Sequence, residues 1–154
     1  MESPLLEIID YKDEHQPFFE SLNRAWIERY FWMEPIDFEV LQEPKEHIIR
    51  NKGKILMARY DNKIVGTVAL KFVQEGVYEF TKMAVDNHYQ GLKIGKALAI
   101  KAIEKAKAEK AHTIILYSNT VLTNAIELYK KLGFVEVPLD GPYKRSNIKM
   151  QLIL

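Results

Sequence analysis

The chain has 154 residues, of which 47% are hydrophobic and 28% charged, and it carries a net charge of +1 and no cysteine. This length and composition are typical of a folded protein with one core, so we expect a single domain over residues 1–154 and little disorder. The balanced charge does not favour a nucleic acid or an acidic membrane as a partner, and the absence of cysteine excludes disulfides, thiolate metal sites and a cysteine nucleophile.

The N-terminal segment bears on secretion and membrane insertion, and the histidines bear on metal binding. Residues 1–10 contain Glu2 and no basic stretch, so they do not resemble a secretory signal, and no apolar segment approaches the ~18 residues that a membrane span needs. We therefore expect a soluble, cytoplasmic protein with no membrane partner. The four histidines are scattered, without the spacing of metal ligands, so we expect no metal.

The first third of the chain predicts one strand and two helices. Residues 5–11 read as a short strand, and Asp13 is a suitable cap for the helix that follows. The apolar positions of this helix recur every four residues, at Phe18, Leu22, Trp26 and Tyr30. A second helical stretch covers residues 44–51 and is expected to stop at Gly53.

The middle of the chain predicts three consecutive strands. Residues 54–60 and 63–72 are joined by the turn Asp61-Asn62, which is a hairpin signal. A third strand, residues 78–85, follows a turn at Gly76. We expect these strands to pair antiparallel.

The last third of the chain alternates helices and strands. The predicted elements are a helix over 93–110, a strand over 113–117, a helix over 121–132 closed by Gly133, and a final strand over 147–154. The complete order of elements predicts an α+β fold on a mixed sheet.

The passage from the third strand into the following helix carries most of the chemical information. Helix starts expose about four unpaired N–H groups and the positive end of the helix dipole. Gly91 and Gly95 let the backbone approach a ligand without a Cβ, and Gln90, Lys93 and Lys96 add side-chain donors and charge. A turn of this kind binds anions, most naturally a pyrophosphate.

Known phosphate-binding motifs restrict the identity of that ligand. A Walker loop requires GxxxxGK[ST], whereas three residues separate Gly91 from Gly95 here and Ala97 replaces the metal-binding hydroxyl. The dinucleotide motif GxGxxG is also absent. Taken alone, the loop is also compatible with an ordinary helix start that uses two glycines for packing.

Two motifs together resemble the GNAT superfamily of acetyltransferases. Gln90-x-x-Lys93-x-Gly95, after a strand that ends Met83-Ala84-Val85, is similar to motif A of that family, and Asn124-Ala125 with Tyr129 and Leu132-Gly133-Phe134 is similar to its motif B. The resemblance covers essentially the whole chain and implies a twisted, mostly antiparallel sheet of about six to seven strands flanked by about four helices. Lys93 stands where the family usually has a glycine.

The resemblance implies acetyl-CoA as cosubstrate and assigns residues to it. The backbone amides that would hold its pyrophosphate are those of Gln90, Gly91, Leu92, Lys93, Ile94, Gly95 and Lys96. The pantetheine arm would pair with the backbone of Met83, Ala84 and Val85 as an added strand. Asn124 would form a hydrogen bond to the same arm, and the alternative is an ordinary polar residue in the first turn of a helix.

Acetyl transfer to an amine requires a base. An alkyl amine has a pKa near 10.4, so forming its neutral, nucleophilic form at pH 7 costs about 4.6 kcal/mol. Glu79 is a carboxylate inside an otherwise apolar strand, where burial raises the pKa toward the useful range. In the family a glutamate at this strand position often serves as general base; the alternative is a glutamate at a strand edge or in a salt bridge.

The attacked thioester requires a donor for its oxyanion, and the departing thiolate requires a proton. A backbone N–H near Ala84 or Val85 is the candidate for the first role. The resemblance implies Tyr129 for the second, with packing of a half-buried helix tyrosine as the alternative. Because the chain has no cysteine, direct transfer in a ternary complex is favoured over a covalent acyl-enzyme.

The acceptor is specified only as a small-molecule or peptide amine. Phe31, Trp32 and Glu34 lie where family members often wall the acceptor cleft, and Glu34 is suited to attract a cationic amine. Arg145 is a candidate partner for a substrate carboxylate or, alternatively, a solvated loop residue. Dimers are common in the family, and residues 148–154 are a candidate to take part in a homodimer. A catalytically silent acetyl-CoA-binding or sensing module is the alternative to an enzyme.

Overall fold

The strands and helices follow the chain in nearly the predicted order. The computed structural model describes residues 5–141 and 143–154. Its strands are β1 (Leu6–Asp10), β2 (Lys54–Tyr60), β3 (Lys63–Gln74), β4 (Val77–Val85), β5 (Thr113–Ser118), β6 (Val135–Val137) and β7 (Ile148–Ile153). Its longer helices are α1 (Gln16–Tyr30), α2 (Pro35–Gln42), α3 (Ile94–Ala108) and α4 (Thr123–Lys131). Within the described ranges, no helix is both long and apolar enough to cross a membrane.

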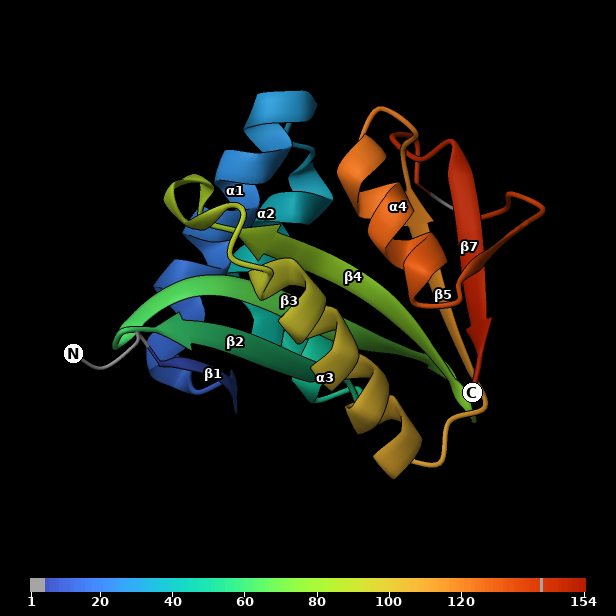
Figure 1. Cartoon of the computed structure of the whole chain (residues 1–154), viewed down its shortest axis with the longest axis horizontal. Coiled ribbons are helices and arrows are strands. Elements are labelled where there is room, and N and C mark those ends of the chain that lie inside the picture. Colours follow the sequence, from blue (N-terminus) through green and yellow to red (C-terminus); the bar gives the residue numbers. More distant parts are fainter. Residues whose placement is uncertain (1–4, 142) are drawn as a thin grey trace.

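All seven strands of the described chain form one sheet, in the order β1-β2-β3-β4-β5-β7-β6. Every neighbouring pair is antiparallel except β4 and β5, which are parallel. Figure 1 shows α3 and α4 in front of this sheet and α1 and α2 behind it. The arrangement confirms the predicted α+β fold on a mixed, mostly antiparallel sheet.

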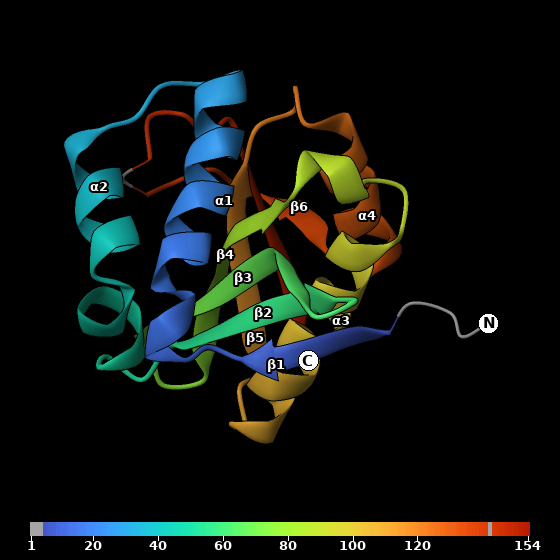
Figure 2. The same ribbon diagram turned by 90° about the vertical axis from the view of Figure 1, so that its left-hand side faces the viewer.

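Two hydrophobic clusters pack on opposite faces of the sheet. One lies under α3 and α4 and includes Phe80, Leu98 and Tyr129, and the other lies under α1 and α2 and includes Phe19 and Met57. Figure 2 shows the two pairs of helices on either side of the strands. The sheet is therefore buried on both faces, which explains why its central strands are apolar almost without interruption.

Two local signals behave as predicted. Asp61 and Asn62, which join β2 to β3, both have a positive φ (49° and 65°), the conformation that a two-residue hairpin turn needs. Gly133, with φ of 104°, follows α4, and the N–H of Phe134 donates to the carbonyl of Tyr129. Phe134 is then buried in the cluster under α3 and α4.

The buried face of α1 differs from the predicted one. Phe19, Asn23 and Ile27 are buried, whereas Phe18 and Tyr30 of the predicted stripe are 46% and 43% exposed. The predicted buried face was wrong by one position. The buried residues also recur every four positions, but one of them is the polar Asn23, so they did not form an apolar pattern in the sequence. The side-chain amide of Asn23 donates to the carbonyl of Phe19 at 2.9 Å, so its burial leaves this donor satisfied.

Two elements were not predicted, and one prediction was too long. α2 carries Pro35 in its first turn, and Glu34 and Asp37 form a reciprocal capping box at its start. The predicted helix over residues 44–51 is a single turn, Lys45–Ile49. β6 is a three-residue strand that pairs with β7, so the C-terminal strand lies inside the sheet rather than at its edge. Its part in a homodimer stays a prediction.

β4 and β5 pair over only part of their length. Their contacts run from Val77 and Thr113 to Phe80 and Leu116, where the pairing of the described strands ends. Beyond this point β4 pairs with β3 alone, through Thr81, Ala84 and Val85. Figure 1 shows the two strands diverging from their common lower end. One edge of β4 is therefore left without a neighbouring strand in the middle of the sheet.

Candidate active site

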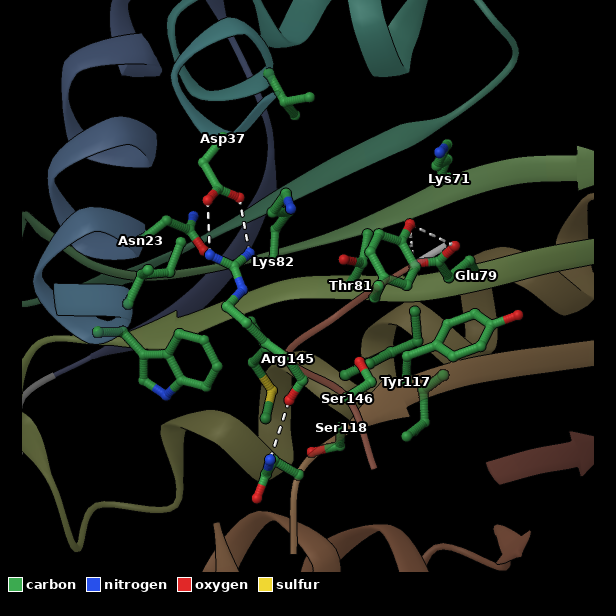
Figure 3. Close-up of a pocket in the computed structure, with 18 of the residues that line it drawn as sticks. Asn23, Asp37, Lys71, Glu79, Thr81, Lys82, Tyr117, Ser118, Arg145 and Ser146 are labelled. Carbon is green, nitrogen blue, oxygen red and sulfur yellow. Dashed lines mark hydrogen bonds and ion pairs between the residues drawn. The ribbon is translucent and has the colours of Figure 1, made fainter. Parts of the chain in front are cut away.

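A cavity of about 390 Å³ opens where β4 and β5 separate. Its wall includes residues of these two strands, of α1 and α2, Lys71 of β3, one residue of α4 and the segment that precedes β7. Figure 3 shows part of this lining, with Lys71 labelled. The lining mixes aromatic and aliphatic side chains with a few charged groups, which is the usual composition of a ligand site.

Glu79 lies in the cavity wall close to the last paired position of β4 and β5. Its side chain is buried and is only 6% exposed. Burial raises the pKa of its carboxyl, while a hydrogen bond from Tyr143 and the charges of nearby lysines reduce that increase. Glu79 therefore accepts a proton more readily than a solvated glutamate does.

Tyr143 holds this carboxylate from the opposite wall. Its hydroxyl donates to both Oε1 and Oε2 of Glu79, at 3.1 and 2.9 Å. Its ring packs edge to face on Tyr117 of β5, with the ring centroids 5.1 Å apart. Burial and the negative charge of Glu79 raise the pKa of Tyr143, so its hydroxyl keeps its proton.

Tyr129 reaches the same cavity from α4. Its ring is 7% exposed and packs against Phe80 and Phe134, with centroids 5.7 and 5.9 Å away. Burial raises the pKa of its hydroxyl. Tyr129 therefore packs in the core and also borders the cavity together with Glu79, and its role as general acid stays a prediction.

A bulge in β4 turns Lys82 into the cavity. The pairing with β3 slips by one residue here, and Lys82 has φ of 57°, in the left-handed region. A regular strand would direct Lys82 to the face occupied by Phe80, whereas Met83 takes that face instead. Lys82 consequently lines the cavity (Figure 3). Desolvation lowers the pKa of its ammonium, although the charges of Asp37 and Glu79 favour the charged form.

A buried ion pair joins α2 to the segment before β7. Nη1 and Nη2 of Arg145 donate to the two carboxylate oxygens of Asp37 at 2.6 and 2.8 Å (Figure 3). Asp37 is 2% exposed. Burial opposes its ionisation, but hydrogen bonds from Arg145 and from the N–H of Glu34 outweigh that effect and hold the pKa of Asp37 below its usual value.

The residues predicted to contact the acceptor divide into two groups. Phe31, Glu34 and Arg145 line the cavity. Trp32 is 59% exposed and does not belong to the lining, and its carbonyl accepts a hydrogen bond from Arg145. Arg145 is therefore a structural ion-pair partner at the cavity wall and not a solvated loop residue.

The predicted anion-binding loop lies between β4 and α3. In the described chain the backbone N–H groups of residues 90–96 donate to no protein acceptor, and residues 91–93 are exposed. The side chain of Gln90 donates to the carbonyl of Val85 at 3.2 Å and ties the loop to β4. A row of free N–H groups at a helix start fits a phosphate-bearing ligand.

Backbone conformation explains the unusual composition of this loop. Gly91 has φ of 82°, and a Cβ added to it would meet nothing within 4 Å. Lys93 caps α3 with φ of 61°, the conformation that favours glycine at this position. A lysine held there costs roughly 1 kcal/mol more than a glycine. The atom nearest to a Cβ added at Gly95 is the methyl of Met83, 3.8 Å away, so the loop adjoins the cavity wall.

The other residues predicted to bind acetyl-CoA lie near the gap between the strands. Met83, Ala84 and Val85 belong to the stretch of β4 that has no partner on the β5 side, and Met83 also lines the cavity. Asn124 is exposed in the first turn of α4 and is not part of the cavity lining. Its hydrogen bond to the pantetheine arm stays a prediction.

Sequence reasoning missed several charged or hydroxyl groups of the cavity, of which Asp37, Lys82 and Tyr143 matter most for its charges. The signal for Asp37 was its spacing from Glu34 in a capping box. The signal for Lys82 was the same as that used for Glu79, a charge inside an apolar strand. Tyr143 had no local signal, because its role depends on a contact across the fold.

The structure also bears on metal binding. The residues that it describes contain no group of three or more histidine, aspartate or glutamate side chains able to hold a metal ion. The expectation that no metal takes part stays a prediction.

Comparison with known proteins shows which family and which relatives the chain resembles. A model of the acetyltransferase (GNAT) family matches residues 11–134. The chain is 38% identical to N-acetylaspartate synthetase of Xenopus tropicalis over 99 residues, which are 63% of this chain and 36% of that protein. It is 34% identical to human N-acetylaspartate synthetase over 97 residues, 62% of this chain and 32% of that one. The aligned part is therefore about a third of the length of these relatives.

Solved structures agree with the fold. A GNAT-family acetyltransferase from Staphylococcus aureus Mu50 superimposes with a TM-score of 0.86 at 22% identity, covering 96% of this chain and 98% of that one. The PaiA N-acetyltransferase of Thermoplasma acidophilum, solved in complex with coenzyme A, superimposes with a TM-score of 0.76 at 21% identity, covering 97% and 99%.

Proposed function

Because this chain belongs to the acetyltransferase (GNAT) family, we propose that it transfers the acetyl group of acetyl-CoA to an amine by direct attack in a ternary complex. The observation that carries the proposal is that Glu79 and Tyr129 border one cavity beside the unpaired edge of β4. In this proposal residues 1–154 act as one catalytic unit.

Acetyl-CoA supplies an activated acetyl group as a thioester. Its diphosphate is held by the free N–H groups of residues 90–96 and by the charges of Lys93 and Lys96. Its pantetheine arm adds to the open edge of β4 at residues 83–85. The hydrogen bond from Gln90 to the carbonyl of Val85 supports this path, because it keeps the loop next to that edge.

Glu79 acts as general base. An alkyl ammonium must lose a proton before it can attack, at a cost of about 4.6 kcal/mol at pH 7. The raised pKa of Glu79 improves it as a proton acceptor, and Tyr143 orients the carboxylate. The proton passes from the amine nitrogen to a carboxylate oxygen, directly or through one water.

Tyr129 acts as general acid toward the departing thiolate. Burial is the sole cause of its raised pKa, so the hydroxyl stays protonated until a strong base forms beside it. A backbone N–H near Ala84 or Val85 donates to the oxyanion that develops on the thioester. With no cysteine in the chain, the acetyl group passes to the amine without a covalent acyl-enzyme.

The acceptor is a small amine. A cavity of about 390 Å³ lies in the range of small-molecule sites. The names of two relatives, N-acetylaspartate synthetase from Xenopus tropicalis and from Homo sapiens, make aspartate the first acceptor to assay.

The test is acetyl transfer by the purified 154-residue chain. Acetyl-CoA is supplied with amino acids, amino-acid amides, polyamines and a lysine peptide, and both thiol release and the acetylated product are measured. We expect a product with at least one amine and intersecting initial-velocity lines, which are the signature of a ternary complex.

Two outcomes would contradict the proposal. Tight CoA binding without transfer to any amine would favour a silent acetyl-CoA-binding or sensing module. Thermal stabilisation by ATP but not by CoA would assign the loop at residues 90–96 to another phosphate ligand.

A further inference from the structure

The side chain of Lys82 lines the cavity without an ion-pair partner among the described residues. No carboxylate oxygen of the described chain lies within ion-pair distance of its Nζ, because the salt bridges of that chain involve other lysines. Its ammonium is nevertheless desolvated by the surrounding protein. An ammonium in such a position is costly without a counter-charge, and an anionic ligand that enters the cavity would supply one.

The nearest aspartate does not fill this role. Oδ2 of Asp37 already accepts from Nη1 of Arg145 and from the N–H of Glu34, and Oδ1 accepts from Nη2 of Arg145. Both oxygens of this carboxylate therefore already accept hydrogen bonds, in the cap of α2 and in the ion pair with Arg145. Lys82 therefore lies near the Asp37–Arg145 ion pair without taking part in it.

The guanidinium of Arg145 also has N–H groups that donate to no acceptor among the described residues. Its Nη1 is used by Asp37 and by the carbonyl of Trp32, and its Nη2 is used once by Asp37. A guanidinium has five N–H donors, so the N–H of Nε and the second N–H of Nη2 remain without an acceptor among the described residues. These two donors form the second edge of the guanidinium, which matches a carboxylate.

The geometry points to an acceptor that carries a carboxylate: we propose that Lys82, together with the free edge of Arg145, binds the carboxylate of an amino acid whose amine faces Glu79. The inference rests on the proposed acetyl transfer and deepens it by specifying the chemical class of the acceptor. Lys82 is then a specificity-determining residue, and Glu79 remains the base.

The bulge in β4 agrees with this orientation. Glu79 and Lys82 are three positions apart and would face opposite sides of a regular strand, but the extra residue at the bulge brings both into the cavity lining. The two side chains reach inward from these positions into one cavity. An amino acid bound in this cavity would place its amine toward Glu79 and its carboxylate toward Lys82.

The test compares acceptors that differ only in the carboxylate. Each amino acid accepted by the enzyme is paired with its carboxamide, which has nearly the same shape and no charge; for aspartate these are asparagine and isoasparagine. We expect the carboxylate form to be preferred about 10- to 100-fold in kcat/KM, the worth of a hydrogen bond to a charged group. Equal use of both forms by the wild-type enzyme would overturn the inference while leaving acetyl transfer intact.

Lys82→Met removes the ammonium and keeps an unbranched side chain. It is expected to lower kcat/KM for the carboxylate acceptor by the same 10- to 100-fold, mainly through KM, and to change it less than about threefold for the carboxamide. Lys82→Arg keeps the charge and is expected to retain the preference. Lys107→Met, at an exposed position of α3 outside the cavity lining, is the matched control and should change neither value.

A second measurement does not depend on turnover. The deaminated form of the preferred amino acid, for example succinate for aspartate, is expected to compete with the acceptor and not with acetyl-CoA, and to bind wild type more tightly than Lys82→Met in calorimetry. If no amine is acetylated, the proposed function fails, and binding of the acid that is lost in Lys82→Met would still support the site. Equal binding to both proteins, or acetylation of Lys82 itself by acetyl-CoA in mass spectrometry, would overturn the inference.

Discussion

The hydroxyl of Tyr143 donates to both carboxylate oxygens of Glu79, across 64 positions of sequence. This contact connects the segment before β7 to β4, one residue before the pairing of β4 with β5 ends at Phe80. The hydrogen bond favours the charged form of Glu79, while burial favours the neutral form. The proton affinity of the proposed base is therefore set by two opposing effects that mutations can separate.

Replacing Glu79 by glutamine removes the proposed base and keeps the shape of the side chain. We expect kcat/KM for the amine to fall about 10²- to 10⁴-fold, the usual contribution of a general base, with little change in acetyl-CoA affinity. Steady-state kinetics and calorimetric titration with CoA check both statements. Glu75→Gln, in the exposed turn before β4, is the control, and an equal loss there would remove Glu79 from its role.

Replacing Tyr143 by phenylalanine removes a hydrogen bond that lowers the pKa of Glu79. The pKa of Glu79, already raised by burial, should rise further, so the acidic limb of the kcat/KM profile should move to higher pH. The profile is measured with one acceptor, because the pKa of the amine then stays constant. Tyr60→Phe is the control, and a limb that stays in place or moves to lower pH in Tyr143→Phe would contradict the assignment.

Replacing Tyr129 by phenylalanine deletes the proposed acid and preserves the ring that packs on Phe80 and Phe134. We expect kcat to fall by at least about 10²-fold with KM for acetyl-CoA almost unchanged, because the proton is required only as the thiolate leaves. The melting temperature should change little. Tyr78→Phe deletes a buried hydroxyl that bonds the carbonyl of Lys52, away from the cavity, and serves as control. An unchanged kcat in Tyr129→Phe would exclude this residue as the acid.

Replacing Lys93 by glycine relieves a positive φ at the start of α3. Compared with Lys93→Ala, which also removes the charge and keeps the strain, Lys93→Gly should be about 1 kcal/mol more stable in urea unfolding. Both variants should bind acetyl-CoA less tightly than wild type at low salt and more nearly equally at high salt, since only the lysine charge is lost. Equal stability of the two variants would show that the backbone is not strained.

Replacing Asp37 by alanine leaves the guanidinium of Arg145 without its ion-pair partner. Breaking a buried pair costs about 3 kcal/mol, which corresponds to a melting temperature lower by about 6–12 °C for a chain of this size. Because the pKa of Asp37 is held below its usual value, the stabilisation is present at neutral pH and shrinks as the pH falls through that pKa. Thermal unfolding from pH 7 to pH 3 tests this, with Glu39→Ala on the exposed side of α2 as control.

The features that the sequence predicted are local in origin. The hairpin at Asp61-Asn62, the end of α4 at Gly133 and the loop around Gly91, for which phosphate binding stays a proposal, depend on backbone conformations that a few neighbouring residues favour. Glu79 was predicted for the same kind of reason, because a carboxylate within an apolar strand is unusual in itself. Residue types and spacing over ten or so positions are sufficient for such features.

The missing features depend on contacts between distant segments. The identity of Tyr143 does not indicate that it bonds Glu79, and a loop arginine such as Arg145 is compatible with solvent until α2 brings Asp37 to it, 108 positions away in sequence. The direction of Lys82 depends on a bulge that appears only when β4 is paired with β3. The sequence by itself therefore determined the fold, the family and the proposed base, and only the tertiary structure decided which charges meet in the cavity, because side-chain pairing is a property of packed elements and not of the segments that form them.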